Sequence, residues 1–321
     1  MFCLLNLRLH NASYELSLWF KFIMFANNFN EMETIRKPAW LHKKMDFEGI
    51  AELTAMLRSL KLHTVCEGAR CPNISECFKR KTATFMILGD VCTRNCSFCA
   101  IPQSVPQTVD DQEPEHVAEA AFALGLRHVV VTSVTRDDLG DGGAQQFALT
   151  IQELRKRLPQ ATIEVLIPDF KGKTQAIDIV IQAHPDIINH NMETVPSVFN
   201  RVRPMGNYTV SLDVLRYVKE NASSIITKSG IMVGLGETPD EVEQVMNDMR
   251  SVDCDVMTIG QYLPPSSKHA LLKEYVSEEQ FAKYKTIALN KGFVYVASSP
   301  YVRSSYNASE DMDLIQKKLR P

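Results

Sequence analysis

The chain has 321 residues and a formal net charge of −3, from 35 basic and 38 acidic side chains. This balance excludes the strongly basic footprint of a nucleic-acid-binding protein, and eight cysteines are too few for a disulfide-stapled scaffold of this length. The length suits one α/β barrel, because such barrels commonly exceed about 200 residues as a single domain.

The first 31 residues show none of the motifs found later in the chain. Residues 16–26 form an apolar run interrupted by Lys21, which is shorter than the roughly 20 residues that a membrane-spanning helix needs. The segment also lacks the small-residue cleavage site of a signal peptide. We expect residues 1–35 to be a disordered or non-native N-terminal extension, with Met24 or Met32 as the true start. An organelle transit peptide is the alternative.

The first chemical motif is a trio of cysteines, Cys66, Cys71 and Cys77, spaced Cys-x4-Cys-x5-Cys. Thiolates are soft ligands that select iron–sulfur clusters, zinc or Cu(I) over hard cations. A structural zinc ion normally has four protein ligands, whereas three cysteines around a four-iron cluster leave one iron open to another ligand. The trio therefore predicts a metal or cluster site.

A second trio, Cys92, Cys96 and Cys99, follows the apolar run 84–88 with the spacing Cys-x3-Cys-x2-Cys. If the run is a strand, the thiols lie at its carboxyl end, where barrel and open α/β enzymes keep their chemistry. A zinc knuckle with a distant fourth ligand and three buried thiols are the alternatives that the spacing leaves open.

Beyond the second trio, predicted strands and helices alternate to the end of the chain. Helices are expected to start at Pro114, at Thr238 and at Ser277, each followed by acidic side chains in the first turn. Such alternation implies a parallel sheet with right-handed crossovers. The predicted strands are the apolar or β-branched runs 84–88, 128–134, 162–168, 187–191, 227–234, 257–263 and 293–297.

The second trio, with Phe98 directly before its third cysteine, resembles the radical S-adenosylmethionine (SAM) superfamily. The resemblance implies an α/β fold, a partial (β/α)6 TIM-type barrel with N- and C-terminal extensions. It also implies that Cys92, Cys96 and Cys99 hold a [4Fe–4S] cluster whose open iron is chelated by SAM. The reduced cluster of that family cleaves SAM to a 5′-deoxyadenosyl radical.

The first trio narrows the resemblance further. Residues 66–73, Cys-Glu-Gly-Ala-Arg-Cys-Pro-Asn, and residues 303–306, Arg-Ser-Ser-Tyr, are similar to the lipoyl synthase family. The similarity begins near residue 36 and covers roughly the last nine-tenths of the chain. Further segments that resemble the family are 131–134, 136–139, 141–144, 166–170, 189–196, 201–204, 227–238 and 260–263.

This resemblance implies that Cys66, Cys71 and Cys77 hold an auxiliary [4Fe–4S] cluster with a serine as fourth ligand. We expect that serine to be Ser305, with Ser304 as the alternative. The implied reaction inserts two sulfur atoms, at C6 and C8 of a protein-bound octanoyl-lysine, with two SAM molecules consumed and sulfur taken from the auxiliary cluster. Unactivated C–H bonds require a radical, which cofactors supply and proteins position.

Polar or aromatic residues near the predicted strand ends are candidates for the SAM site. Arg203 is the candidate for the SAM carboxylate, because a guanidinium binds a carboxylate with two hydrogen bonds. His190 is expected to be structural. The other candidates are Phe98, Thr132, Ser133, Asn189, Asn191, Glu193 and Lys228.

The implied organisation is an N-terminal extension at 36–81 with the auxiliary cysteines, a barrel at 82–292 and a C-terminal segment at 293–321. The implied partners are an octanoylated lipoyl-carrier domain (glycine-cleavage H protein or 2-oxoacid dehydrogenase E2), an electron donor such as ferredoxin or flavodoxin, and iron–sulfur assembly proteins. No nucleic acid and no membrane are expected. Because cluster thiolates must stay reduced, a cytoplasmic location is expected.

Two other function classes remain open from the sequence. One is a different radical SAM enzyme, such as a methylthiotransferase or a biotin-synthase-like sulfurase, although neither family pattern includes Arg-Ser-Ser-Tyr. The other is a non-enzymatic zinc or iron–sulfur module that binds metal without consuming SAM. Formation of 5′-deoxyadenosine separates an enzyme from such a carrier.

Overall fold

The computed structural model of the chain describes residues 36–41, 47–79 and 84–306. Contacts divide the chain into two units, Met1–Pro38 and Ala39–Pro321, and the description below concerns the second. The expected extension at 1–35 and the last part of the predicted C-terminal segment lie outside the described residues. Within the described ranges, no helix is long and apolar enough to cross a membrane.

The second unit is built on one open sheet in which spatial order follows chain order from β1 to β8. Strand β1 pairs antiparallel with β2, and all later pairs are parallel. The strands are β1 (His63–Thr64), β2 (Thr84–Ile87), β3 (His128–Ser133), β4 (Thr162–Leu166), β5 (Ile187–Asn189), β6 (Ile226–Val233), β7 (Val256–Gln261) and β8 (Tyr295–Ser298). The predicted partial α/β barrel is thus confirmed, and its seven parallel strands, β2 to β8, correspond to the seven predicted runs.

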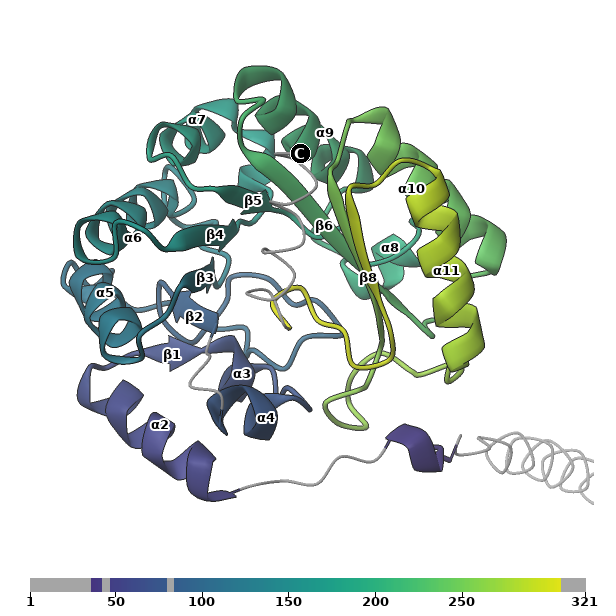
Figure 1. Cartoon of the computed structure of the whole chain (residues 1–321), viewed down its shortest axis with the longest axis horizontal. Coiled ribbons are helices and arrows are strands. Elements are labelled where there is room, and N and C mark those ends of the chain that lie inside the picture. Colours follow the sequence, from purple (N-terminus) through teal and green to yellow (C-terminus); the bar gives the residue numbers. More distant parts are fainter. Residues whose placement is uncertain (1–35, 42–46, 80–83, 307–321) are drawn as a thin grey trace, which may run out of the picture. The chain divides into compact units, whose positions relative to one another are not determined.

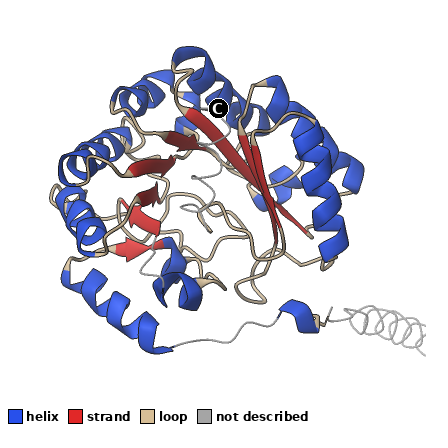
Figure 2. Ribbon diagram, viewed as in Figure 1, coloured by secondary structure: helices blue, strands red, loops and turns tan. Residues whose placement is uncertain are grey.

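Helices α5, α6, α7, α9, α10 and α11 line the outer side of the curved sheet, as Figures 1 and 2 show. The predicted starts are confirmed: Thr238 and Glu241 form a reciprocal capping box on α10, and Ser277 accepts the Gln280 N–H at the start of α11. The helices are η1 (Ala39–Leu41), α2 (Phe47–Ser59), α3 (Val65–Gly68), α4 (Ile74–Lys79), α5 (Glu113–Ala123), α6 (Ala144–Arg157), η2 (Phe170–Gly172), α7 (Thr174–Gln182), α8 (Pro196–Val202), α9 (Tyr208–Asn221), α10 (Pro239–Ser251) and α11 (Glu278–Asn290).

Two main hydrophobic clusters stabilise the unit. One joins β2–β5 to α5–α7 around Phe147 and Ile151, and the other joins β6–β8 to α10 and α11 around Met249 and Phe281. Parallel strands covered by helices are apolar on both faces, which explains why β2 and β7 are continuously buried. Each large side chain buried in this way contributes about 1.5–3 kcal/mol.

A glycine on β7 lets the C-terminal segment come close to the sheet. A Cβ atom on Gly260 would lie 2.2 Å from the carbonyl oxygen of Val302, so any larger residue would push this segment away. One residue before Val302, the carbonyl oxygen of Tyr301 accepts a hydrogen bond from Asn73 Nδ2 at 2.8 Å. The end of the described chain therefore lies against the N-terminal helices that carry the first cysteine trio.

Candidate active site

The Cys92 trio lies in the loop that leaves the carboxyl end of β2. The loop is tied to its neighbours by backbone hydrogen bonds from Thr93 N to Thr135 O at 3.0 Å and from Ser97 N to Val202 O at 2.8 Å. It is therefore anchored both to the end of β3 and to the end of α8. The prediction that these three cysteines follow a strand, at its carboxyl end, is confirmed.

The thiols of this loop are close enough to influence one another. Burial raises the pKa of Cys96 to about 12, with Arg203 opposing the shift and Glu193 and the other two cysteines adding to it. Burial likewise raises the pKa of Cys99 to about 11. The Cys92 sulfur accepts backbone N–H groups of Arg94 at 3.4 Å and Thr135 at 3.3 Å. The backbone N–H of Ile101 hydrogen-bonds to the Cys99 sulfur. Three thiols that influence one another, two of them with N–H donors, fit an iron–sulfur cluster, whose metal replaces the thiol protons.

The Cys66 trio is gathered by two short helices. Thr64 caps α3, which holds Cys66, while Cys71 follows that helix and Cys77 lies in α4. Burial raises the pKa of Cys66 to about 12, and the charges of Cys71 and Cys77 add to the shift. The backbone N–H of Thr84 opposes it by hydrogen bonding to the sulfur. The thiols of the Cys66 trio are thus also close enough to influence one another.

The two serines of the Arg-Ser-Ser-Tyr segment lie against different partners. Ser305 Oγ accepts a hydrogen bond from Thr84 Oγ1 at 2.7 Å, and Thr84 is the residue whose N–H reaches Cys66. Ser304 Oγ instead donates to Asn191 Oδ1 at 3.0 Å, on the barrel side. The Tyr306 hydroxyl donates to Glu76 at 3.0 Å, on the helix that holds Cys77.

Arg303 brings positive charge to the same region. Its guanidinium donates to the carbonyl oxygen of Val302 at 2.6 Å and lies near enough to Cys71 for the two charges to interact. Burial lowers the pKa of Arg303, and the thiolate form of Cys71 opposes that shift. All four residues of this segment therefore contact residues far away in the sequence.

Three of the predicted SAM-site residues gather beside the Cys92 trio. Glu193 lies after β5 with a φ of 68°, and burial raises the pKa of its carboxyl group while Arg203 and Asn191 oppose the rise. Both Glu193 and Arg203 act electrostatically on Cys96. Asn191, Glu193 and Arg203 thus form a polar cluster next to the thiols, as the sequence led us to expect.

The remaining SAM-site candidates differ in whether their polar atoms already have hydrogen-bond partners. The Thr132 hydroxyl donates to the carbonyl oxygen of Leu166 at 3.0 Å, which leaves it a role in holding the sheet. Within the described residues, the buried Ser133 Oγ and Asn189 Oδ1 have no hydrogen-bond partner, so they can receive a ligand or water. Phe98 packs against the core around β6 and β7.

Lys228 lies near the amino end of β6, as the predicted run 227–234 also places it, and its side chain is occupied within the sheet, which argues against the expected contact with SAM. It pairs with Asn189 in the register of β5 and β6, and β6 then continues to Val233. Its ammonium group is buried in an ion pair with Glu164 at 2.9 Å. His128 Nε2 lies 3.2 Å from the other oxygen of the same carboxylate. Lys228 is therefore part of a buried network in the sheet.

His190 is buried as expected for a structural residue. Its Nδ1 lies 2.8 Å from the carbonyl oxygen of Ile167, and burial together with Arg203 lowers its pKa to about 4. Within the described part of the chain its Nε2 atom has no partner. The ring is therefore neutral at pH 7.

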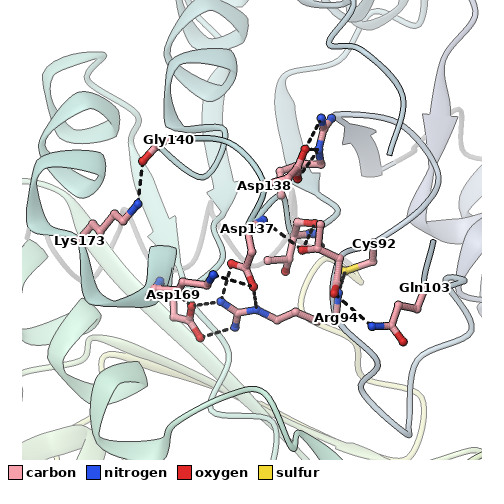
Figure 3. A network of polar contacts seen from close by, with 12 residues as sticks. Cys92, Arg94, Gln103, Asp137, Asp138, Gly140, Asp169 and Lys173 are labelled. Carbon is pink, nitrogen blue, oxygen red and sulfur yellow. Dashed lines mark hydrogen bonds and ion pairs between the residues drawn. The ribbon is translucent and has the colours of Figure 1, made fainter. Parts of the chain in front are cut away.

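The sequence analysis missed a buried ion network that is shown in Figure 3. Arg94, between Cys92 and Cys96, donates to Asp137 at 2.8 and 3.0 Å and to both oxygens of Asp169 at 2.7 Å. Arg203 Nη2 reaches Asp169 at 3.2 Å. Burial opposes ionisation of Asp169, but Arg94 outweighs it and holds the pKa of this carboxyl group well below its usual range.

This network joins the loop that carries the Cys92 trio to the ends of two strands and to the end of α8. Asp137 follows β3 and Asp169 follows β4, so their positions after predicted strands were the available signal. Paired carboxylate and guanidinium groups of this kind orient one another strongly because both are planar and bidentate. Arg94 and Arg203 are consequently held in one fixed arrangement by Asp169.

Across residues 36–41, 47–79 and 84–306, no three His, Cys, Asp or Glu side chains are arranged to hold a single metal ion. None of the seven cysteines in these ranges forms a disulfide. Cys254, outside both trios, is fully buried.

Comparison with known proteins agrees with this geometry. Residues 86–249 match the model of the radical SAM superfamily. Among solved structures, the fold is similar to HydG, a maturase of the [FeFe]-hydrogenase, with a TM-score of 0.55 and 14% identity over 85% of this chain and 67% of that one. It is also similar to SuiB of Streptococcus suis, solved with S-adenosylmethionine, with a TM-score of 0.53 and 13% identity over 79% and 61% of the two chains.

Sequence relatives are closer and more specific. The lipoyl synthase of Caldanaerobacter subterraneus subsp. tengcongensis is 58% identical over 88% of this chain and 99% of its own length. The lipoyl synthase of Alkaliphilus metalliredigens is 52% identical over 88% and 98%. These similarities decide against the other two function classes that the sequence left open. The chain belongs to the lipoyl synthase family of radical SAM enzymes.

Proposed function

We propose that the enzyme divides its chemistry between its two cysteine trios. As a lipoyl synthase, it inserts sulfur at C6 and C8 of a protein-bound octanoyl chain and uses SAM and [4Fe–4S] clusters. In our proposal Cys92, Cys96 and Cys99 hold the cluster that binds SAM, and Cys66, Cys71, Cys77 and Ser305 hold the cluster that donates sulfur. When bound at Cys92, Cys96 and Cys99, the reduced cluster would supply the electron that cleaves SAM, which produces the radical that removes hydrogen.

One observation carries this division: Thr84 contacts both Cys66 and Ser305. Its backbone N–H reaches the Cys66 sulfur, and its hydroxyl donates to Ser305 Oγ at 2.7 Å. The same contact favours Ser305 over Ser304 as the fourth ligand, since Ser304 is hydrogen-bonded to Asn191 instead. A serine oxygen is a harder ligand than a thiolate, so its bond to iron suits a cluster that gives up sulfur.

For the SAM site we propose that Arg203 binds the carboxylate of SAM. Arg203 is buried next to Cys96, and Asp169 and Ser211 hold its guanidinium at 3.2 and 3.1 Å. Asn191, Glu193 and the Ser133 hydroxyl, which has no hydrogen-bond partner among the described residues, supply further polar groups for SAM. These residues bind and orient SAM, while Phe98 closes the apolar side.

The domain division at 36–81, 82–292 and 293–321 belongs to the same proposal. It is supported by the Cys66 trio lying before β2 and by the Arg-Ser-Ser-Tyr segment returning to it. The proposed partners are an octanoylated carrier domain of the H-protein or E2 type, a ferredoxin or flavodoxin as electron donor, and iron–sulfur assembly proteins. The thiolate ligands support a reducing, cytoplasmic location.

The test is mass spectrometry of one anaerobic reaction with reconstituted protein, SAM, dithionite and an octanoyl-lysyl peptide. We expect the peptide to gain two sulfurs while two 5′-deoxyadenosines form for each product. If 5′-deoxyadenosine forms and the peptide is unchanged, the assignment of the Cys66 trio to a sulfur-donating cluster fails. If cluster-loaded protein forms neither product, the assignment of the Cys92 trio fails as well.

A further inference from the structure

We propose that the loop 264–273, together with Arg70 and Arg201, is the docking surface for a folded carrier domain whose face around the acylated lysine is acidic. This inference rests on the proposed function, because it assigns the surface through which the octanoyl substrate is delivered. The loop connects β7 to α11, and we call the surface that it forms with Arg70 and Arg201 the basic rim.

The loop contacts the segments of both cysteine trios. Ala270 N donates to the carbonyl oxygen of Ser97, between Cys96 and Cys99, at 2.7 Å. On its other side, the carbonyl oxygen of Pro265 accepts Arg70 Nη1 at 3.5 Å, and Arg70 directly precedes Cys71. A partner seated on this loop therefore lies within reach of both proposed clusters.

The basic rim has an excess of exposed positive charge. Lys268 and Lys273 are exposed, as are Arg70 and Arg201, and the ten residues of the loop include no Asp or Glu. Within the described part of the chain, none of these four basic side chains forms an ion pair with a carboxylate. The whole chain has a net charge of −3, so this local excess runs against the average.

The geometry near Gly236 brings two of these side chains together. A Cβ atom on Gly236 would lie 3.2 Å from Lys273 Cγ and 3.6 Å from Arg201 Nη2. The nearby Glu237 carboxylate is buried, and its oxygens accept the backbone N–H groups of Gly234 and Leu235 and form no ion pair with these two side chains in the described part of the chain. Glu274, which follows Lys273, is the exposed acid at the edge of the rim.

Apolar side chains accompany the charge. Leu271, in the loop, is 59% exposed, and Met205, after α8, is 49% exposed. The segment holding Met205 is anchored to the cysteine loop, because Ser97 N donates to the carbonyl oxygen of Val202 at 2.8 Å. Exposed apolar side chains framed by charges are typical of protein interfaces, with apolar residues at the centre and charges at the rim.

The structure of the substrate indicates which partner binds the basic rim. An octanoyl chain on a lysine must bring C6 and C8 to both clusters, while the folded domain that bears the lysine stays outside. The surface beside both trios must then receive that domain. Positive charge here attracts an acidic face, which raises the rate of encounter and orients the partner.

The experiment compares charge reversal on the rim with charge reversal elsewhere. The test variant is K268E/K273E, and the matched control is K283E/K285E, two exposed lysines of α11. Each cluster-loaded enzyme is assayed with dithionite, once with an octanoylated H protein and once with a short octanoyl-lysyl peptide. We expect the rim variant to raise the KM for the H protein at least tenfold at low salt, with kcat and peptide turnover unchanged.

Salt provides a second readout. The difference in KM for the H protein between the rim variant and the parent should become smaller at roughly 0.5 M salt, where charges separated by several ångströms are screened. Equal KM values for the rim variant and the parent, or an equal rise in the control pair, would overturn the docking assignment. A defect seen only when a flavodoxin replaces dithionite would overturn it too, by assigning the rim to the electron donor. Failure of the parent enzyme on the peptide would instead refute the proposed function.

Discussion

The two cysteine trios are assembled in opposite ways. The Cys92 trio belongs to one continuous loop that the barrel itself holds, through Thr135, Val202 and the Arg94 network. The Cys66 trio is spread over two short helices, and its proposed fourth ligand comes from the other end of the chain. The first site is therefore arranged by its strand and neighbouring loops, whereas the second exists only once the C-terminal segment has closed on the N-terminal helices.

This difference matches the chemistry required of each site. A cluster that cleaves SAM repeatedly has to keep its geometry, and Asp169 gives its loop a buried, bidentate anchor. A cluster that gives up sulfur has to open, and the contacts that complete its site involve a segment near the chain end.

The largest expected effect comes from removing one cysteine of each trio. Cys92→Ala should lower 5′-deoxyadenosine formation at least about a hundredfold, or about 2.7 kcal/mol in activation free energy, because one cluster ligand is lost. Cys66→Ala should instead spare SAM cleavage and abolish sulfur gain by the peptide. Both products are measured in one anaerobic assay. If Cys66→Ala loses SAM cleavage although the cluster at the Cys92 trio is shown to be loaded, the proposed separation of SAM cleavage from sulfur donation is wrong.

The next effect compares the two adjacent serines. Ser305→Ala should reduce sulfur insertion severely while SAM cleavage continues, because the auxiliary site loses its proposed fourth ligand. Ser304→Ala should keep the auxiliary cluster and should change the binding of SAM, since Ser304 contacts Asn191 beside Glu193. Mössbauer spectra of iron-57-loaded protein report the unique iron. An auxiliary spectrum altered by Ser304→Ala and not by Ser305→Ala would reverse the assignment.

A smaller effect is expected from substitutions in the network around Arg94. Asp169 and Asp137 both pair with Arg94, but only Asp169 also pairs with Arg203. Asp169→Asn should therefore raise the KM for SAM about tenfold relative to Asp137→Asn, which corresponds to about 1.4 kcal/mol of binding free energy. The measurement is the KM for SAM in 5′-deoxyadenosine formation. Equal changes in the two variants would show that Asp169 acts only through the cysteine loop.

Much of the fold was predictable because it depends on local patterns. All seven apolar runs predicted as strands occur in the sheet as β2 to β8, and Thr238 caps α10 as its sequence indicates. Burial on both faces makes a parallel strand recognisable as a continuous apolar run. The placement of the Cys92 trio at the end of β2 followed from the same reasoning.

The rest depended on register and on contacts between distant residues. Lys228 is level with Asn189, the last residue of β5, but its ammonium group is paired with Glu164 on β4, and nothing local in the sequence shows that pairing. Arg94 looked like an ordinary loop residue, since nothing local shows that Asp137 and Asp169 converge on it. The short antiparallel strand β1 was not predicted, because two residues show no periodicity.

The smallest effect on activity, with a clear effect on stability, should come from Glu164 in the middle of β4. Burial opposes ionisation of its carboxyl group, but Lys228 and His128 outweigh burial and lower its pKa to about 2. A lowered pKa means that the unfolded chain takes up the proton more readily. The ion pairs therefore stabilise the fold above about pH 4.5, and this contribution is lost as the pH falls toward 2.

Glu164→Gln should consequently lower the free energy of unfolding at pH 7 by about 3–5 kcal/mol, because Lys228 is left buried without a counter-ion. Glu279→Gln, which removes an exposed ion pair with Lys283 on α11, should cost less than about 1 kcal/mol. Urea denaturation between pH 7 and pH 3 measures the free energy of unfolding of each variant and its dependence on pH. That dependence should be weaker in Glu164→Gln than in the parent, and unchanged in Glu279→Gln. SAM cleavage at 25 °C should stay close to that of the parent, since the hydrogen bonds of Glu164 within the described residues go to His128, Asn189 and Lys228 and none goes to the cysteine loop. A strong loss of SAM cleavage in folded Glu164→Gln would instead place this buried network among the groups that shape the SAM site.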